Sequence, residues 1–258
     1  MTQTSPVVRD DVPEAFDEIA ATYDRMVGMS PGYHAQLRRS ADVLVDAVAA
    51  RPVTADRPLR LVDLGCGSGA STRALVDALA ARGLAADVVG VDGSAGMLGQ
   101  ARAKSWPEGV RFVNARAEEL VDRADLAGDG GLDGVLAAYL VRNVADRDAL
   151  CVGLRDALAP GGALVLHEYS VAGNRAATAV WTATCLGVVV PLGWVTSRRT
   201  RLYRYLWRSV LDFDSVAQLL GRLERAGFVQ VRATTPRGWQ RGIIHTVSGR
   251  RPLPEVAP

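Results

Sequence analysis

Short apolar runs alternate with amphipathic stretches through most of the chain. Apolar runs of strand length predict β-strands, and apolar positions spaced three or four residues apart predict helices. The predicted strands are Leu61–Leu64, Val88–Asp92, Val110–Asn114, Leu132–Ala138 and Ala163–Tyr169. The predicted helices between them are Ala70–Arg82, Ser94–Lys104 and Asp146–Ala159. This alternation is typical of a parallel sheet with right-handed crossovers and helices on both faces.

Further elements precede and follow this alternation. They are helices near Val12–Met26, Gly32–Ala50 and Asp214–Ala226, and strands at Phe228–Thr235 and Gly242–Val247. We therefore expect an α/β fold with a mostly parallel seven-stranded sheet. Residues 1–58 are expected to form an N-terminal helical cap, and residues 59–258 a domain that packs with it as one unit.

The region from Ala172 to Asp212 interrupts the alternation and is expected to be a helical insertion over the sheet edge. Its first part, Ala179–Trp194, is apolar on nearly all faces, but it is shorter than the roughly 20 residues of a membrane-spanning helix. Arginines follow it at positions 198, 199, 201, 204 and 208. The segment is either a lid over an apolar substrate, with a basic rim that contacts anionic lipid, or a buried core or dimer helix.

Composition narrows the class of protein. Of the 258 residues, 30 are basic and 28 acidic, which leaves a net charge of +2. Tyr203, Tyr205 and Trp207 lie between the arginines, a pattern that also occurs in nucleic-acid-binding proteins, but the near-neutral total charge argues against such a partner. The three cysteines form no CxxC pair, so we expect neither a disulfide framework nor a metal site. With no signal-peptide pattern at the N-terminus, a cytoplasmic location is expected.

A glycine-rich loop follows the first predicted strand in the run LVDLGCGSG, Leu61–Gly69. Its glycines let the backbone turn sharply and approach a ligand closely, and the helix N-terminus behind it offers free N–H groups. Asp63, inside the strand, can face a cationic amino acid group. Gly65, Gly67 and Ala70 also satisfy the permissive dinucleotide pattern, so a dinucleotide site and a purely structural turn remain alternatives.

Two residues, one at the end of the second strand and one in the helix that follows it, fit a nucleoside. Asp92 can accept hydrogen bonds from both hydroxyls of a ribose, or it can simply cap the helix that begins near Ser94. Met97 can cover an adenine ring, or it can belong to the hydrophobic core. The pattern therefore indicates a cofactor with an adenosine part.

Four runs resemble the ubiquinone/menaquinone biosynthesis C-methyltransferase family: LVDLGCGSG, GVDGSAGML, LDGVLAAYLVRNVADRDAL and LRDALAPGGALVLHEYS. Arg142-Asn143, followed by Val144 and Asp146, is the most specific part. FDEIAATYD near the N-terminus, and RYL with RAGF near the C-terminus, extend the resemblance over nearly the whole chain. It implies a Rossmann-like class I methyltransferase fold and S-adenosyl-L-methionine as cofactor.

The resemblance also implies a set of site residues. The expected cofactor-binding residues are Asp63, Gly65, Cys66, Gly67, Gly69, Asp92, Gly93, Met97, Ala117, Ala138 and Tyr139. Arg142 and Asn143 are expected to face the substrate, and Tyr23 to close the pocket. Methylation of a phenolic ring on carbon also requires a group that handles a proton. The candidates are Tyr23, His34, Arg142 acting through water, and Glu168.

Each of these catalytic candidates has a structural alternative. Arg142 can form a salt bridge with Asp146 instead of contacting substrate, Glu168 can support another residue, and His34 can be an ordinary surface histidine. His167 is expected to be buried, hydrogen-bonded and on the face of the sheet opposite Glu168, because side chains alternate along a strand.

The chain departs from the family pattern at three places. Ala115-Arg116-Ala117 stands where Gly-Asp-Ala is common, so backbone atoms or Glu118 must bind the adenine amino group. Leu140 stands where a glycine is usual, which reshapes the substrate side. His167 replaces an apolar residue.

The predicted function is transfer of a methyl group to carbon of a quinone- or phenol-like ring in a hydrophobic small molecule. Alternatives are O- or C-methylation of another lipophilic or natural-product metabolite, a non-methyl reaction on the same fold, and nicotinamide-dependent oxidoreduction. No nucleic-acid partner is expected. Residues 179–208 could make a peripheral membrane contact or take part in a homodimer.

Overall fold

The computed structural model describes residues 16, 17, 20, 28, 32–51, 57–122, 130–191, 194 and 201–254. Most of the predicted helix Val12–Met26 therefore lies outside the described residues, as do Arg198 and Arg199. Within the described residues, no helix is long and apolar enough to cross a lipid bilayer.

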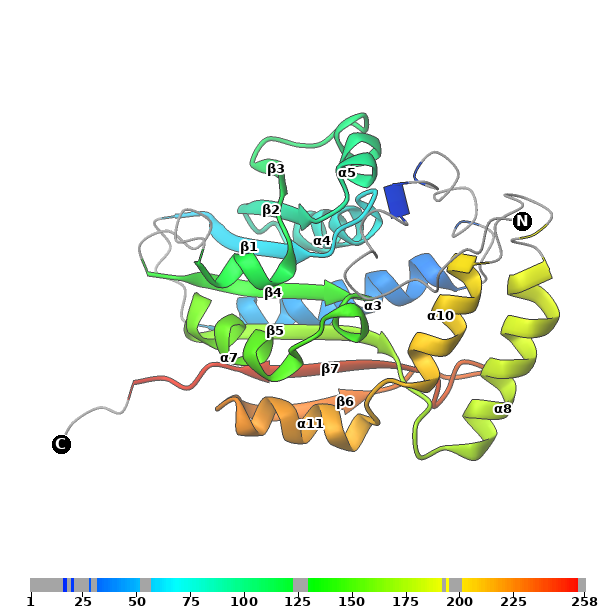
Figure 1. Cartoon of the computed structure of the whole chain (residues 1–258). Coiled ribbons are helices and arrows are strands. Elements are labelled where there is room, and N and C mark those ends of the chain that lie inside the picture. Colours follow the sequence, from blue (N-terminus) through cyan, green and yellow to red (C-terminus); the bar gives the residue numbers. More distant parts are fainter. Residues whose placement is uncertain are drawn as a thin grey trace.

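A seven-stranded sheet forms the centre of the molecule (Figure 1). Its strands are β1 (Leu59–Leu64), β2 (Ala86–Asp92), β3 (Val110–Asn114), β4 (Leu132–Ala138), β5 (Leu158–Tyr169), β6 (Val229–Thr234) and β7 (Ile244–Arg250). The strand order is β3-β2-β1-β4-β5-β7-β6, with β1 to β5 parallel and β7 antiparallel to both of its neighbours. The predicted mostly parallel seven-stranded sheet is confirmed.

Helices cover both faces of this sheet. Helices α3 (Tyr33–Ala49) and α4 (Ala70–Ala81) pack together on one face, and α7 (Arg147–Ala157) and α11 (Val216–Arg225) lie on the other (Figure 1). Helix α5 (Ala95–Arg102) packs along β2 and β3.

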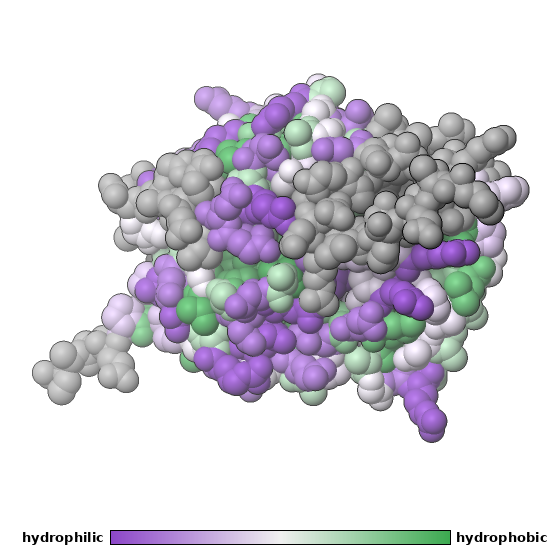
Figure 2. Space-filling model, viewed as in Figure 1, coloured by the Kyte–Doolittle hydropathy of each residue, from purple (hydrophilic) through white to green (hydrophobic). Residues whose placement is uncertain are grey.

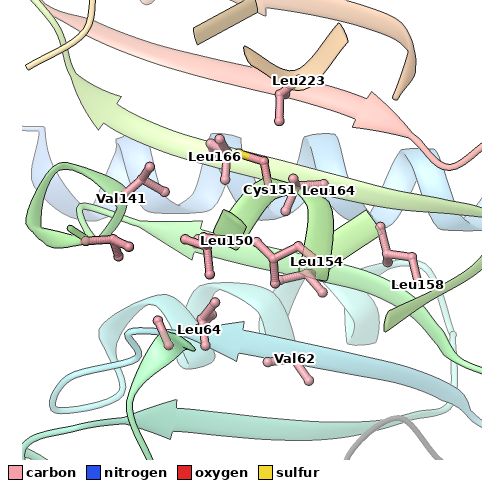
Figure 3. Close-up of a cluster of buried hydrophobic side chains, with 14 of the residues drawn as sticks. Val62, Leu64, Val141, Leu150, Cys151, Leu154, Leu158, Leu164, Leu166 and Leu223 are labelled. Atoms are coloured by element: carbon pink, nitrogen blue, oxygen red, sulfur yellow. The ribbon is translucent and has the colours of Figure 1, made fainter. Parts of the chain in front are cut away.

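Two hydrophobic clusters correspond to the two faces. Figure 3 shows the cluster on the α7 and α11 side, in which Leu154 and Leu223 meet Leu164 and Leu166 of β5. The intervening strand residue Val165 belongs to the cluster with α3 and α4. Alternate residues of β5 therefore point to opposite faces, as the strand geometry requires.

Helix α3 belongs to the core of the domain, because its buried residues share that second cluster with β1, β4 and β5. This part of the predicted N-terminal cap is thus one layer of the α/β sandwich. The domain boundary at residue 58 stays a prediction, since most of the preceding segment is outside the described residues.

The described residues between β5 and α11 form mainly helices and lie beyond the carboxyl ends of the parallel strands (Figure 1). It contains α8 (Arg175–Thr184), a π-helical turn, η4 (Cys185–Val189), and α10 (Arg201–Leu211). We call these three elements the lid segment.

The observed elements differ from the sequence prediction in two respects. Strand β5 begins at Leu158 instead of Ala163, because Leu158 already pairs with Leu132 of β4 ahead of a register shift. Helix α7 ends at Ala157, ahead of the Pro-Gly-Gly sequence that was predicted to end it, and that sequence lies inside β5. Two 3-10 turns, η2 (Ala117–Asp122) and η3 (Val141–Asn143), were not predicted, since such short turns have no hydrophobic period.

Candidate functional site

The glycine loop after β1 has a backbone that only glycine adopts readily. Gly65 and Gly67 have φ angles of 74° and 54°. A Cβ atom on Gly67 would lie 3.2 Å from Cε of Met97, so a side chain there would enter the space between the loop and α5. The loop thus leaves an open cradle in front of α4.

Asp92 connects this loop to the next helix. Its Oδ2 accepts a hydrogen bond from the N–H of Gly67 at 2.8 Å, and its Oδ1 accepts one from the N–H of Ser94 at 2.8 Å. The helix cap of α5 is Ser94, whose hydroxyl accepts from the N–H of Met97. Asp92 is therefore not the N-cap. Burial raises the pKa of the Asp92 carboxyl, although its two backbone hydrogen bonds act in the opposite direction.

Asp63 lies beneath the loop, fully buried. Its Oδ2 accepts hydrogen bonds from the hydroxyls of Ser71 at 2.8 Å and Thr72 at 2.6 Å, which fixes the first turn of α4. Its Oδ1 is buried and has no hydrogen-bond partner among the described residues. Burial raises the pKa of Asp63 to about 6, against the two hydroxyl bonds.

A cavity of about 370 Å³ runs from the glycine loop to the lid segment. The predicted site residues that line it are Gly65, Cys66, Gly67, Asp92, Gly93, Met97, Ala117, Ala138, Tyr139, Arg142 and Asn143. Asp63 and Glu168 are buried behind the residues that line the cavity and do not line it themselves. Gly69 is the residue before α4, where a Cβ would lie 2.8 Å from the Trp106 ring.

Arg142 and Glu168 form a buried ion pair next to the cavity. Arg142 Nη1 lies 2.7 Å from Glu168 Oε2, and the Arg142 N–H donates to Glu168 Oε1 at 3.4 Å. Burial raises the pKa of Glu168, and Arg142 limits the rise. The alternative salt bridge from Arg142 to Asp146 is wrong, because the Asp146 carboxylate caps α7 by accepting from the N–H of Ala149.

Asn143 joins the site to the lid segment. Its Oδ1 accepts a hydrogen bond from the Tyr205 hydroxyl of α10 at 3.1 Å, and its Nδ2 donates to the Tyr139 carbonyl at 3.4 Å. Arg142 and Asn143, predicted as a pair, therefore point in different directions. Arg142 contacts Glu168, and Asn143 contacts the lid segment.

Comparisons with known proteins agree with this geometry. The model of the ubiE/COQ5 methyltransferase family matches residues 4–248. The chain belongs to this family. The ubiquinone/menaquinone biosynthesis C-methyltransferase UbiE of Stutzerimonas stutzeri is 30% identical over 93% of this chain and 89% of its own. The demethylmenaquinone methyltransferase of Thermus thermophilus is 33% identical over 83% of this chain and 90% of its own.

A solved structure supports the fold. The plantazolicin methyltransferase BpumL, solved with a triazolic desmethylPZN analogue and S-adenosylhomocysteine, superposes with a TM-score of 0.64 at 11% identity, covering 95% of this chain and 96% of that one. Together with family membership, this makes the chain an S-adenosylmethionine-dependent methyltransferase with a class I fold.

The site has room and chemistry for this cofactor. The glycine cradle admits a ligand against the backbone, and an acidic residue stands at the end of β2 where a ribose can bind. The buried Asp63 oxygen without a protein partner supplies negative charge under the loop. Arg116, Ala117 and Glu118, the residues expected near the adenine, also line the cavity.

Two predicted proton handlers have a different outcome. His34 is exposed on α3 and does not line the cavity, whereas Tyr33 and Leu37 of the same helix do. The core-facing stripe of α3 passes through residues 33 and 37, so His34 points away, and a role in catalysis does not fit this position. Tyr23 lies outside the described residues.

Sequence reasoning missed several residues that line the cavity. They are Phe16, Tyr33, Tyr203, Trp239, Gln240 and Ile243, from the N-terminal region, α3, α10 and the loop before β7. Trp181 also lines the cavity and lies in the predicted lid Ala179–Trp194. Tyr169 at the end of β5 also lines it, and its place at a strand end was a usable signal. Trp239 and Gln240 follow a Pro-Arg-Gly sequence that carries no such signal.

The raised pKa of Asp63 gives a pH-dependent stability prediction. The Asp63 carboxyl keeps its proton up to about pH 6 in the folded protein, but only up to about pH 3.9 in the unfolded chain. The stability that this difference contributes is therefore complete below about pH 4 and is lost as pH rises through about 6. Asn at this position does not titrate. The unfolding free energy of Asp63→Asn minus that of the wild type should therefore rise by roughly 2 to 3 kcal/mol between these pH values and then level off.

Urea unfolding at a series of pH values measures this difference. Asp87→Asn, at an exposed position of β2, serves as the matched control. A difference for Asp63→Asn that stays constant over the range would contradict the assigned environment of this carboxyl.

Proposed function

We propose that this methyltransferase transfers the methyl group to a carbon atom of a quinone- or phenol-like ring in a hydrophobic small molecule. The main support is the continuous cavity, which joins the glycine loop to a chamber lined by aromatic and aliphatic side chains of the lid segment. The names of the two relatives, a ubiquinone/menaquinone C-methyltransferase and a demethylmenaquinone methyltransferase, support this substrate class.

The cofactor-binding roles in this proposal follow the lining of the cavity. Gly65 and Gly67 would hold the methionine part, with Asp63 beneath it as the nearby negative charge. Asp92 would accept the ribose hydroxyls with lone pairs not used by Gly67 and Ser94, and Met97 would cover the adenine. When bound, the cofactor supplies a methyl group already activated by the sulfonium, so the protein's task is alignment and removal of a proton.

Arg142 is the residue we assign to the acceptor's oxygen. Its side chain is only 5% exposed, it lines the cavity, and Glu168 fixes its position. In such a poorly hydrated site a fixed cation favours the negative charge that develops on a ring oxygen as its proton leaves. Glu168, whose pKa is raised by burial, would act behind Arg142 rather than on the acceptor itself.

A second acceptor class is favoured by one observation. Leu140 lines the cavity and packs on the glycine loop, where a Cβ on Gly65 would lie 3.0 Å from the Leu140 side chain. Because a glycine is expected at position 140, the chamber next to the cofactor loop is narrowed in this chain. O- or C-methylation of another lipophilic or natural-product metabolite is therefore the second candidate function.

An acceptor panel tests the proposal. Calorimetry should show binding of S-adenosylmethionine and none of NAD. Release of S-adenosylhomocysteine is then followed with hydroquinones, with and without prenyl tails, and with monophenols and hydroxylated polyketides. We expect turnover with the hydroquinones and a methyl group on ring carbon by NMR. A product methylated on oxygen favours the second candidate, and cofactor binding without turnover on any acceptor would reject methylation of these classes.

Loss of the Arg142 charge should affect turnover far more than cofactor affinity. Arg142→Ala would leave Glu168 buried without its partner, so the double variant Arg142→Gln/Glu168→Gln, which removes both charges, is the better test. We expect kcat to fall by about 10²-fold and the Kd of S-adenosylmethionine to change little. Arg155→Gln, at a half-buried position of α7 outside the cavity lining, is the control. A comparable loss of cofactor affinity would mean that Arg142 belongs to the cofactor site.

We also propose that the enzyme is cytoplasmic and contacts lipid through the lid segment. Val180, Leu186 and Val188 are 43%, 48% and 58% exposed, and Arg204 and Arg208 of α10 are exposed as well. Figure 2 shows hydrophobic surface at the right of the molecule, where α8 lies in Figure 1. Apolar side chains next to arginines favour an anionic lipid surface.

Vesicle flotation tests this contact. Binding to vesicles that contain phosphatidylglycerol should exceed binding to pure phosphatidylcholine, and Val180→Glu/Leu186→Glu should weaken it about tenfold while Val152→Glu, at an exposed position of α7, should not. If light scattering instead shows a dimer that the lid variant dissociates, this surface is an interface between two copies of the chain.

A further inference from the structure

Tyr139 has a backbone conformation that is unusual for its residue type. It follows directly after β4, and its φ angle is 58°, in the left-handed region that L side chains rarely adopt. Such a residue persists only where its surroundings fix it, and positions of this kind concentrate at functional sites. The Tyr139 side chain lines the cavity.

His167 of β5 holds Tyr139 at two points. The Tyr139 N–H donates to the His167 carbonyl at 2.7 Å, and the Tyr139 hydroxyl lies 3.2 Å from His167 Nε2. On its other side, His167 Nδ1 lies 2.9 Å from the hydroxyl of Thr246, the residue directly opposite it on β7. The imidazole is therefore fixed from both sides, as the sequence predicted for a buried, hydrogen-bonded histidine.

Neighbouring rings fix the plane of the Tyr139 ring. It stacks on Tyr33 of α3, with centroids 5.7 Å apart, and on Tyr169 of β5, with centroids 4.8 Å apart. Tyr169 in turn packs on Trp181 of α8 at 4.7 Å. All four rings line the cavity, so one wall of it is a row of aromatic side chains that reaches from α3 to the lid segment.

The Tyr139–His167 pair is neutral. Burial lowers the pKa of His167 to about 3, and burial raises the pKa of Tyr139 well above its usual value. His167 and Glu168 are adjacent in β5 and point to opposite faces of the sheet. The carboxyl edge of the sheet therefore carries the neutral Tyr139–His167 pair on one face and the Arg142–Glu168 ion pair on the other. The Arg142 guanidinium lies 5.9 Å from the Tyr139 ring centroid.

We propose that the Tyr139 hydroxyl binds a hydroxyl group of the acceptor ring, and that His167 is a positioning residue that sets the direction of the Tyr139 hydroxyl. The Tyr139 hydroxyl also has a hydrogen bond with Tyr169. A tyrosine hydroxyl has one proton and two lone pairs, so its contacts with His167 and Tyr169 leave one lone pair for a further group. When the Tyr139 proton points to Nε2, a lone pair can accept from the acceptor. The inference rests on the proposed function and adds that the acceptor must carry a hydrogen-bond donor on its ring.

A double-mutant cycle tests this assignment. The variants are Tyr139→Phe, His167→Leu and the double variant, and the probe is 1,4-dihydroxynaphthalene titrated under nitrogen into enzyme saturated with S-adenosylhomocysteine. Each single variant should raise the Kd of the probe about three- to tenfold, the size of one neutral hydrogen bond. The double variant should be no weaker than Tyr139→Phe, because His167 acts only through that hydroxyl.

Two further variants separate positioning from general stability. His167→Gln keeps a side chain that can hydrogen-bond Tyr139 and should recover part of the affinity lost in His167→Leu; it also serves if His167→Leu does not fold. His245→Leu, at a half-buried histidine of β7 outside the cavity lining, should leave the Kd unchanged. The Kd of S-adenosylhomocysteine should stay within about twofold in every variant, because the Tyr139 hydroxyl is assigned to the acceptor and His167 acts only through that hydroxyl.

The outcomes are distinct. Losses that add in the double variant, an unchanged probe Kd, or a wild type that does not bind the probe would overturn the assignment of Tyr139 and His167. In another outcome the wild type binds the probe and the cycle behaves as expected, but no acceptor in the panel is methylated. The proposed function then fails, and the assignment of the two residues stands.

Discussion

The hydrogen bonds that Asp92 accepts from the N–H groups of Gly67 and Ser94 are the contacts on which the site depends. They tie the loop after β1 to the start of α5, and the Gly67 N–H donates from a loop in which Gly65 and Gly67 adopt left-handed backbone angles. Since β1 and β2 are parallel and adjacent, their carboxyl ends meet, and a carboxylate ending one strand reaches the loop that leaves the other. The strand order then brings the ends of β4 and β5 to the same edge, where Arg142, Tyr139, His167 and Glu168 gather.

The alternation of side chains along β5 divides the acceptor side of the site into two parts. Glu168 points to the face of α7 and α11 and holds Arg142, while His167 points to the face of α3 and α4 and holds Tyr139. Tyr139 and Arg142 both belong to the turn that follows β4. Of the two neighbouring positions of β5, His167 therefore forms the neutral pair and Glu168 forms the ion pair. The lid segment closes this arrangement through the bond from Tyr205 to Asn143 and the contact of Trp181 with Tyr169.

The sheet, the cofactor loop and most of the expected cofactor-binding residues could be predicted from the sequence, because each depends on local pattern: an apolar run, a glycine turn, an acid at a strand end. What failed depended on the tertiary structure. The phase of α3 is set by packing of Leu37 and Leu44 on the sheet, which turns His34 outward. The partner of Arg142 comes from a neighbouring strand, not from Asp146 nearby in sequence. Trp239 and Gln240 reach the cavity from a loop whose path only the folded chain determines.

The distribution of charge suits a cationic ligand. Arg142 is compensated by Glu168 at 2.7 Å, and burial keeps His167 neutral, so neither adds a net positive charge to the wall. Asp63 and Asp92 lie on the other side, under and beside the glycine loop. In a poorly hydrated cavity an imidazolium at position 167 would repel a sulfonium over several ångströms, whereas a neutral imidazole can still orient Tyr139. Under the proposed assignment, burial of His167 in the sheet serves two requirements at once: the neutral imidazole orients the Tyr139 hydroxyl, and it adds no positive charge next to the cofactor.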